Sequence, residues 1–419
     1  MEITKSQIGS LIIEGKTKQV YNLNGADHKN HVYVLSKDRI TAGDGVKSHT
    51  LEGKSILSTK TNCAIFEYLN AIGIKTHFVS RVAESNPDYQ KAFVAKKCEM
   101  IPIEWVSRRV ATGSFLKRHP HIKEGHRFAP LKLETFFKDD ANHDPFWSEE
   151  TLIGAEMNIG GLLITEEYVR EMFQITNLVF EVLERAWQTA NHSLIDMKIE
   201  FGVAEENGIK TVVVADCIDN DSWRLWPNGE KRLMLDKQVY RNMDNSKIDA
   251  EALNLATDGT KYAPSVAIVV GSPSDKDYAY KIRDQLNHKY GVHNVDVHVS
   301  SAHKGTDKTL KLGARLQQWT STKAVIAVAG MSNGLGPVLA ANVPIPVISS
   351  PPTTDVSVLS ADIWSSLRIP SGMSTATVLG SDQAALFAAN IVANSDAFVW
   401  ATIRTVQAYN IVRLIHATL

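Results

Sequence analysis

Residues 266–275 read Val-Ala-Ile-Val-Val-Gly-Ser-Pro-Ser-Asp, an apolar run followed at once by a glycine- and serine-rich loop. Four further short apolar runs follow, with helical patterns between them: Val295–Val299, Ala324–Ala329, Pro346–Ile348 and Ala376–Leu379. Short apolar strands that alternate with helices are typical of a parallel sheet covered on both faces. The tail, residues 382–419, has apolar residues at helical spacing. Residues 264–419 are therefore predicted to form a three-layer α/β domain with a parallel sheet.

Three polar loops of this segment follow the first three predicted strands, at 271–275, 300–305 and 330–337. Open α/β sheets bind ligands at the carboxyl ends of their strands, and backbone N–H groups at a helix start bind phosphate. His303, with Lys304 beside it, is a candidate acid–base group there. A single histidine or Gly/Ser loop is more often structural, so each of these signals is weak by itself.

Composition excludes several classes of protein. A chain of 419 residues that is 44% hydrophobic has room for two or three domains with real cores. Its net charge of −1 provides no bulk basic field for nucleic acid or anionic lipid, and no apolar run reaches the length of a membrane span. The first residues lack the apolar core of a signal peptide, and the three cysteines have no zinc or disulfide spacing. We therefore expect a cytosolic protein with reduced thiols.

Charge is distributed unevenly along the chain. Residues 1–260 hold 32 Lys and Arg and 37 Asp and Glu, whereas residues 261–419 hold 13 and 9, with no Glu at all. So few charges suit a domain buried against other subunits, although a compact Ala-rich domain would also have few. The change falls in a polar stretch, 247–263, which we interpret as a linker between domains at 1–258 and 264–419.

The first domain has the pattern of an α+β fold. Strand-like stretches occupy its start, at Leu11–Ile13, Lys18–Leu23, Val32–Leu35 and Phe93–Cys98. A helix is predicted after Thr165, a candidate N-cap, because two glutamates follow it and apolar residues then recur on one face from Val169 to Trp187.

Residues 14–21, Glu-Gly-Lys-Thr-Lys-Gln-Val-Tyr, lie between two strand-like runs. Gly-Lys-Thr suggests a P-loop, but Ser10 stands where that pattern needs glycine, and a strand follows in place of a helix. A hairpin that covers nucleotide phosphates, with Lys16 and Lys18 as cationic contacts, fits better. An ordinary basic hairpin remains the alternative.

Residues 194–202 alternate between polar and apolar side chains, which predicts a strand with Asp196, Lys198 and Glu200 on one face. The Asn-Gly pair at 207–208 predicts a hairpin whose return strand is Thr211–Ala215, followed by Asp216. Glu200 and Asp216 would then lie within about one residue of facing each other. Facing carboxylates need a cation, which is either Mg²⁺ shared with phosphates or, if the face is solvated, Lys198.

Arg224 and Arg241, further along the chain, suit bidentate capture of phosphate or carboxylate. In combination, residues 10–241 resemble the SAICAR synthetase family of purine biosynthesis. The motifs that carry this resemblance occur in the family's order: Glu14–Tyr21, Lys37–Asp44, Leu51–Lys54, Ile103–Ser114, Lys138–Pro145, Asp196–Gly202 and Asp216–Trp226. The resemblance implies ATP-dependent amide formation, in which the carboxylate of carboxyaminoimidazole ribotide (CAIR) becomes an acyl phosphate and the amine of L-aspartate attacks it.

The same resemblance implies roles for individual residues. Lys16, Lys18, Glu99 and Met100 would bind ATP, the last two at the adenine. Glu200 and Asp216 would hold Mg²⁺. The ribotide or aspartate would be bound by a third set, comprising Arg108, Ser114, Asp144, Arg224, Lys237 and Arg241.

Nearly all of residues 264–419 resemble the PurE-type carboxylases of aminoimidazole ribotide (AIR). Lys304, where the bacterial mutases carry Arg, implies the animal class that uses CO₂ directly, without biotin or ATP. His303 would then take the C4 proton of AIR, and Lys304 would hold CO₂ or the new carboxylate. The residues implied in substrate binding are Gly271, Ser272, Ser274, Asp275, Ser301, Gly330, Ser332, Asn333 and Gly334. Met331 departs from the family's pattern.

The order of the two segments resembles the bifunctional family of animals in which both activities share one chain. That family implies AIR, CO₂, CAIR, L-aspartate and ATP as small-molecule partners, no nucleic acid or membrane partner, and a homo-octamer built through the carboxylase domain.

Two other classes of protein stay open on the residues alone. One is an ATP-dependent ligase that uses another amine in place of aspartate. Measuring which amino acid supports ADP release distinguishes it. The other is a non-catalytic nucleotide-binding scaffold, which has no need of a proton acceptor and a metal pair together.

Overall fold

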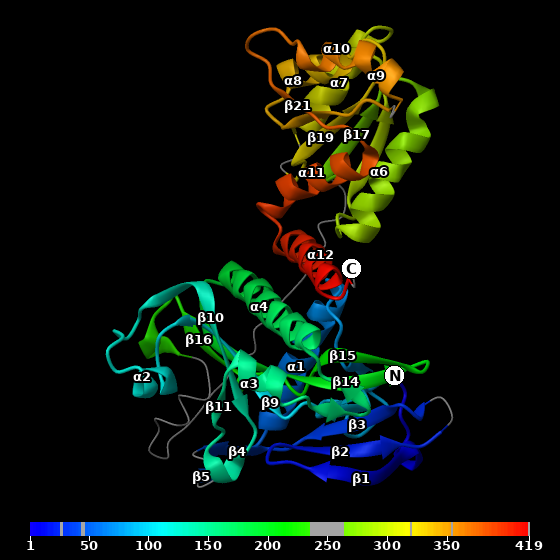
Figure 1. The fold of residues 1–419 in the computed structure, drawn as a ribbon. Coiled ribbons are helices and arrows are strands. Elements are labelled where there is room, and N and C mark those ends of the chain that lie inside the picture. Colours follow the sequence, from blue (N-terminus) through cyan, green and yellow to red (C-terminus); the bar gives the residue numbers. More distant parts are fainter. Residues whose placement is uncertain (26–27, 43–46, 235–263, 319–320, 353–354, 418–419) are drawn as a thin grey trace. The chain divides into compact units, whose positions relative to one another are not determined.

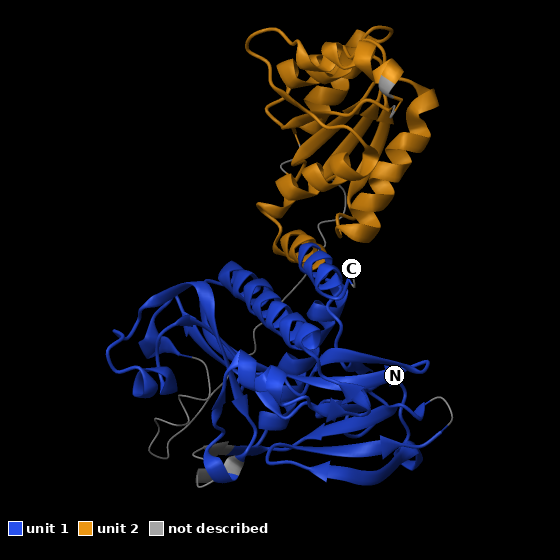
Figure 2. Cartoon of the chain, in the orientation of Figure 1, with its two compact units in different colours: residues 1–256, 407–419 blue, residues 257–406 orange. Residues whose placement is uncertain are grey.

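The computed structural model describes residues 1–25, 28–42, 47–234, 264–318, 321–352 and 355–417. Two compact units make up the chain, one of residues 1–256 with 407–419 and one of residues 257–406 (Figure 2). The stretch that we interpret as a linker, 247–263, lies outside the described residues. Among the described helices, none is both long enough and apolar enough to cross a membrane.

A five-stranded antiparallel sheet begins the first unit (Figure 1). Its spatial order is β1 (Ile8–Glu14), β2 (Lys18–Leu23), β3 (His31–Ser36), β7 (Ala92–Lys96) and β6 (Phe78–Arg81). All four strand-like stretches expected near the start fall on these strands, although β7 ends at Lys96 and Cys98 begins another strand. Helix α1 (Lys54–Ala71) packs against this sheet and buries Phe66 beside Phe78.

A second sheet of seven strands is built around one long strand, β14 (His192–Glu206). Its other strands are β8 (Cys98–Met100), β9 (Ile103–Val110), β10 (Arg127–Phe137), β11 (Phe146–Trp147), β15 (Ile209–Ala215) and β16 (Trp223–Pro227). The predicted helix is α4 (Glu166–Thr189), and it packs on β14 and β9. It begins after Thr165 as expected, but the Thr165 hydroxyl bonds to Glu167 and not to the helix backbone.

Short elements complete this unit. They are a 3-10 turn at Lys5–Gln7, β4 (Arg39–Ala42), β5 (Lys47–Thr50), α2 (Ser114–Arg118), a 3-10 turn at Asp140–Asn142, α3 (Glu149–Gly154), β12 (Asn158–Ile159), β13 (Leu162–Leu163) and a 3-10 turn at Lys231–Leu233.

The second unit is the predicted three-layer α/β domain. Its parallel sheet has the order β18 (Val295–Val299), β17 (Val266–Val270), β19 (Ala324–Val328), β20 (Val347–Ser349) and β21 (Thr375–Thr377). Each predicted strand is present; β17 and β18 have the predicted bounds, and the ends of the other three differ by one or two residues. All five residues of β17 and of β19 are buried, as the uninterrupted apolar runs predicted.

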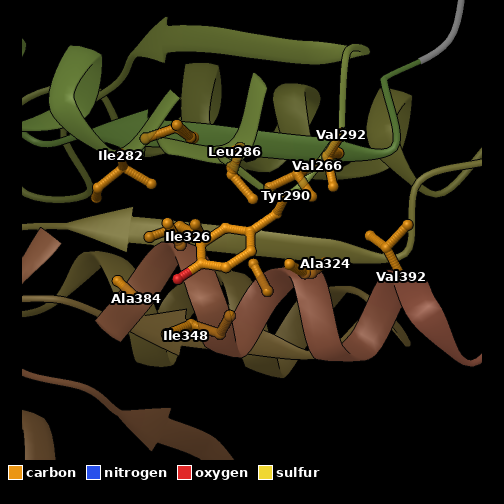
Figure 3. Packing of buried hydrophobic residues seen from close by; sticks show 14 of the residues in the cluster. Val266, Ile282, Leu286, Tyr290, Val292, Ala324, Ile326, Ile348, Ala384 and Val392 are labelled. Atoms are coloured by element: carbon orange, nitrogen blue, oxygen red, sulfur yellow. The ribbon is translucent and has the colours of Figure 1, made fainter. Parts of the chain in front are cut away.

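Helices cover both faces of this sheet. One face buries α6 (Lys276–Lys289) and α11 (Ser381–Ala393), and Figure 3 shows Ile282, Leu286, Ala384 and Val392 packed in that cluster. The other face buries α7 (Thr306–Leu316) and α8 (Leu335–Asn342). The remaining elements are a 3-10 turn at Pro273–Asp275, α9 (Val356–Asp362) and α10 (Trp364–Leu367), together with α12 (Ala397–Ile415), whose residues from Gln407 onward belong to the first unit. Because the crossover connections of β17 and β19 lead in opposite directions, the sheet has a switch point between these two strands, where ligands bind in such folds.

Candidate active sites

The basic motif at 14–21 forms the predicted hairpin between β1 and β2. The Gly15 N–H donates to the Lys18 carbonyl oxygen at 2.9 Å, which closes the turn. Lys37 stabilises the turn, because its Nζ donates to Glu14 Oε1 at 2.6 Å and to the Gly15 carbonyl oxygen at 3.0 Å. Lys16 is exposed, whereas half-buried Lys18 forms an ion pair with Asp216. The hairpin therefore brings a lysine to one of the two predicted metal ligands.

Glu200 and Asp216 are neighbours across the β14–β15 ladder. Glu200 pairs with Ala215, so Asp216 lies one residue beyond it, as the Asn-Gly turn predicted. The backbone of Asp216 is left-handed, with φ at 65°, which turns the chain at the end of β15. This register places both carboxylates at the same end of the hairpin.

Lysines surround the buried carboxylate of Glu200. Lys138 Nζ lies 2.8 Å from its Oε2 and Lys198 Nζ 3.3 Å from its Oε1, and Lys198 also pairs with Glu104. Burial works to raise the pKa of Glu200, but the lysines outweigh it and hold that pKa below its ordinary value. Glu200 is therefore ionised at neutral pH.

This donor set suits Mg²⁺. No cluster of three or more His, Cys, Asp or Glu side chains that could hold a metal occurs within the described ranges. Mg²⁺, however, is commonly held by one or two carboxylates together with substrate phosphates, and it keeps waters in its remaining positions. Glu200 and Asp216 can supply the protein share of such a site.

A buried ion network joins the predicted substrate residues Arg108 and Arg224. Both guanidinium groups donate to the same oxygen, Oδ2 of buried Asp196, and the Arg108 Nη1 distance is 3.2 Å. Arg108 Nε also donates to buried Glu134 at 2.5 Å, which in turn accepts from Arg118. The two arginines are thus held beside each other from two different strands, β9 and β16.

Ser114 begins α2 next to this network, directly after Gly113. The φ of Gly113 is +60°, which favours glycine, and a Cβ there would lie 2.6 Å from Nη2 of Arg224, so a larger residue would displace this guanidinium group. A cavity of about 270 Å³ opens beside it, with Arg224, Glu124 and Lys231 on its wall. Arg108 and Arg224 therefore share one carboxylate, and Ser114 directly follows the glycine that lies against Arg224.

The other predicted residues of this domain are more dispersed. Glu99 and Met100 are exposed on β8, paired with Val203 and Gly202 of β14. The Asp144 carboxylate accepts from the backbone N–H of Asp139 at 2.8 Å and so shapes the loop that carries Lys138. Lys237 and Arg241 lie outside the described residues.

The sequence predicts no role for Lys138 and Asp196, and it indicates Lys198 only as the alternative cation for the two carboxylates. The alternation at 194–202 had placed Asp196 and Lys198 on one face with Glu200, which was a usable signal. It did not indicate that Asp196 and Glu200 are buried, because the arginines and Lys138 that pair with them come from distant segments.

In the second unit, the three predicted loops meet at the carboxyl edge of the sheet. Gly271, at the end of β17, donates to Val328 of β19, and a Cβ on Gly271 would lie 3.5 Å from Ala329. Ser272 accepts from the N–H of Ser274 and caps the turn that contains Asp275. Burial raises the pKa of Asp275.

His303 faces the glycine loop that follows β19. A Cβ added to Gly334 would lie 2.7 Å from His303 Nε2, so the imidazole occupies the space over this glycine. Ser301 accepts from the N–H of Lys304 at 3.2 Å, which fixes the short turn between them. His303 and Lys304 are both exposed at this edge and therefore open to a ligand.

Asn333, one of the predicted substrate residues, is buried and bonded within the protein. Its Nδ2 donates to Ser366 Oγ at 3.0 Å and its Oδ1 accepts from the Gly336 N–H at 3.0 Å. Gly330 and Ser332 lie in the same loop, while the Met331 side chain is 81% exposed.

Comparison with known proteins identifies both segments. Residues 11–255 match the SAICAR synthetase family and residues 265–411 match the AIR carboxylase family. The bifunctional phosphoribosylaminoimidazole carboxylase/phosphoribosylaminoimidazole succinocarboxamide synthetase of Drosophila melanogaster is 48% identical, over 97% of this chain and 94% of its own length. The Homo sapiens protein of the same description is 45% identical, over 95% and 93%.

A solved structure of phosphoribosylaminoimidazole-succinocarboxamide synthase from Ehrlichia chaffeensis is 30% identical, with a TM-score of 0.48, and covers 55% of this chain and 91% of its own. The full-length relatives and the two matched segments agree in order and extent. The chain therefore belongs to the family of bifunctional AIR carboxylases/SAICAR synthetases.

Proposed function

We propose that this chain catalyses two consecutive steps of de novo purine biosynthesis, the carboxylation of AIR with CO₂ to CAIR and the ATP-dependent condensation of CAIR with L-aspartate to SAICAR. The observation that carries this proposal is the presence of two separate constellations in one chain. One joins Lys18, Glu200 and Asp216, and the other joins His303 to the 330–334 loop. The full-length relatives carry both activities in their names.

In the carboxylation step, C4 of AIR attacks CO₂, and a C–C bond forms. His303 then takes the C4 proton, whose bonding electrons return to the imidazole ring, so that no oxidant, ATP or biotin is needed. Lys304 neutralises the new carboxylate, and the glycine-rich 330–334 loop lies beside it. The ribose and phosphate of the ribotide bind at the 271–275 turn and Ser301, which supply serine hydroxyls and the Asp275 carboxylate at the carboxyl edge of the sheet.

In the synthetase step, the carboxylate of CAIR takes the γ-phosphoryl group of ATP, and the aspartate amine then displaces phosphate. Lys16 and Lys18 hold the ATP phosphates, and Glu99 and Met100 lie at the base. Glu200 and Asp216 would hold Mg²⁺, which neutralises phosphate charge when bound. Positioning and charge neutralisation lower the barrier, so no nucleophilic side chain is required.

The substrate is oriented by a second group of residues in that domain. Arg108, Ser114 and Arg224 hold the ribotide or aspartate, a role that the place of Arg224 on the cavity wall and its shared carboxylate with Arg108 support. Asp144 shapes the loop of Lys138, and Lys237 and Arg241 add further cationic contacts.

We also propose a cytosolic homo-octamer built through the carboxylase domain, which the scarcity of charge after residue 261 supports.

An omission assay tests the proposed function. Purified protein receives AIR, bicarbonate, L-aspartate and Mg-ATP, and one component is left out at a time. AIR with bicarbonate alone should yield CAIR without ADP, and CAIR with aspartate and Mg-ATP should yield SAICAR, ADP and phosphate. Release of ADP with another amino acid in place of aspartate, or no CAIR in the first mixture, would contradict the proposal.

A further inference from the structure

Three side chains of the α9–α10 segment hold the glycine-rich loop beside His303. Asp362 Oδ2 accepts from the backbone N–H of Met331 at 2.8 Å. Ser365 Oγ accepts from the N–H of Asn333 at 2.9 Å and lies 3.1 Å from the Met331 carbonyl oxygen, to which its hydroxyl can donate. Ser366 Oγ accepts from the Asn333 side chain at 3.0 Å. We call Asp362, Ser365 and Ser366 the brace.

The brace acts on a backbone conformation that needs support. Met331 is a non-glycine residue with φ at +52°, a left-handed conformation that such residues adopt at some energetic cost. Its side chain is 81% exposed, so side-chain packing does little to hold it there. Asp362 accepts from the N–H of this same residue, and the Ser365 hydroxyl lies 3.1 Å from its carbonyl oxygen and 2.8 Å from the carbonyl oxygen of Asp362. They therefore stabilise the turn directly.

The 330–334 loop contacts His303, the candidate acid–base residue, at its Gly334 end. Gly334 lies so close to His303 that a Cβ there would be 2.7 Å from Nε2. Asn333 links the two ends, because its side chain joins the buried Ser366 to the N–H of Gly336 at the start of α8. A shift of Met331 would therefore be transmitted along four residues to the surface that faces His303.

From this geometry we infer that Asp362 is a positioning residue for carboxylation, which, with Ser365 and Ser366, fixes the 330–334 loop against His303. The inference rests on the proposed function of this edge of the sheet. Asp362 acts through the loop backbone and contacts no reacting atom, so its hydrogen-bonding ability, more than its charge, determines its effect. The brace should thus affect turnover at the His303 site more than the binding of the ribotide.

The test compares Asp362→Ala and Asp362→Asn in the full chain, with CAIR decarboxylation measured as the reverse reaction and SAICAR synthesis as an internal control. Asp362→Ala should lower kcat for decarboxylation about tenfold to a hundredfold, because small misplacements of catalytic groups have effects of this size. KM for CAIR should change less than about twofold, and SAICAR synthesis should keep its rate. Asp362→Asn, which retains an acceptor oxygen, should recover most of the lost kcat.

Asp355→Ala provides the matched control. Asp355 precedes the same helix, α9, and its carboxylate accepts from the N–H of Ser357 at 2.8 Å, so its loss weakens the start of the helix whose last residue is Asp362. Decarboxylation should stay near the wild-type rate in this variant. Ser365→Ala, which removes the acceptor of the Asn333 N–H and the hydroxyl beside the Met331 carbonyl oxygen but leaves the Asp362 bond in place, should give a smaller decrease than Asp362→Ala and covers the case in which that variant fails to fold.

Three results would overturn the inference: a wild-type kcat in Asp362→Ala, an equal loss in Asp355→Ala, or no recovery in Asp362→Asn. A wild-type kcat in Ser365→Ala when Asp362→Ala does not fold would do the same. The activity of the wild-type chain distinguishes a failure of this inference from a failure of the proposed function. If it fails to decarboxylate CAIR, the function is wrong, whereas an active wild type with an active Asp362→Ala variant contradicts only the brace.

Discussion

Replacing Asp196 with alanine removes the carboxylate that holds two arginines together in the synthetase domain. Asp196 Oδ2 accepts from Arg108, which is 4% exposed, and from Arg224, which is 15% exposed. Removal of one partner from a buried ion pair typically costs about 3–5 kcal/mol, because the remaining charge stays buried without compensation. Arg108 keeps Glu134 at 2.5 Å and Arg224 has some access to water. We therefore expect the lower end, about 3 kcal/mol.

For a domain of this size, about 3 kcal/mol corresponds to a decrease in Tm of roughly 6–12 °C. Scanning calorimetry of the full chain measures it, with the unfolding of the carboxylase domain as an internal reference. Asp196→Asn, which keeps the shape and one acceptor, should show a smaller decrease. KM for CAIR should rise in both variants, because Arg224 loses the group that orients it.

Glu67→Ala is the matched control for an exposed pair. Glu67 forms a bidentate pair with Arg81 at 2.7 and 2.9 Å, but both side chains are nearly half exposed. Such pairs contribute less than about 1 kcal/mol, so Tm should hardly change. The reasoning about buried charge would be refuted if Asp196→Ala lowered Tm no more than Glu67→Ala does.

Three other predictions concern acid stability, the carboxylation site and the metal. His77 is buried among Phe66 and Phe93, and burial lowers its pKa to about 3 from 6.5. Between pH 6.5 and pH 3, the His77 imidazole takes up a proton in the unfolded chain but not in the folded chain. The free energy of unfolding should therefore fall by about 2 kcal/mol from pH 7 to pH 5 through His77 alone. Urea unfolding of His77→Phe at the two pH values should show a decrease that is smaller by this amount. Gly334→Ala places a Cβ 2.7 Å from His303 Nε2, so carboxylation should fall at least about tenfold while SAICAR synthesis continues, and equal losses in the two assays would argue against the placement of His303. Chelation of Mg²⁺ with EDTA should stop SAICAR synthesis and leave CAIR formation intact, whereas loss of both would indicate a metal requirement at the His303 site.

The carboxylase domain shows how far apolar runs alone can define a fold. Parallel strands that are buried on both faces are apolar along their whole length, so all five strands could be located from the sequence, and the polar loops after them marked the ligand edge. The brace could not be located in this way. Asp362, Ser365 and Ser366 lie in two very short helices, and their bonds reach a loop some thirty residues earlier in the chain.

The synthetase domain shows the opposite limit. Alternation at 194–202 and the Asn-Gly turn predicted the β14–β15 hairpin and its register to within about one residue, and the structure places Asp216 one residue beyond the partner of Glu200. The partners of that polar face come from strands and loops far away in sequence. Local patterns could not indicate that Asp196 would be enclosed by two arginines, since that depends on how β9 and β16 align with β14.

The central claim, that one chain holds two independent sites, is tested most directly by a pair of variants. Asp216→Asn removes a charge but keeps a residue that tolerates the left-handed backbone at φ 65°, and His303→Ala removes the proton acceptor. We predict that His303→Ala loses carboxylation but still converts CAIR and aspartate to SAICAR, that Asp216→Asn shows the reverse, and that a mixture of the two converts AIR to SAICAR. Loss of both activities in either folded variant would contradict the account.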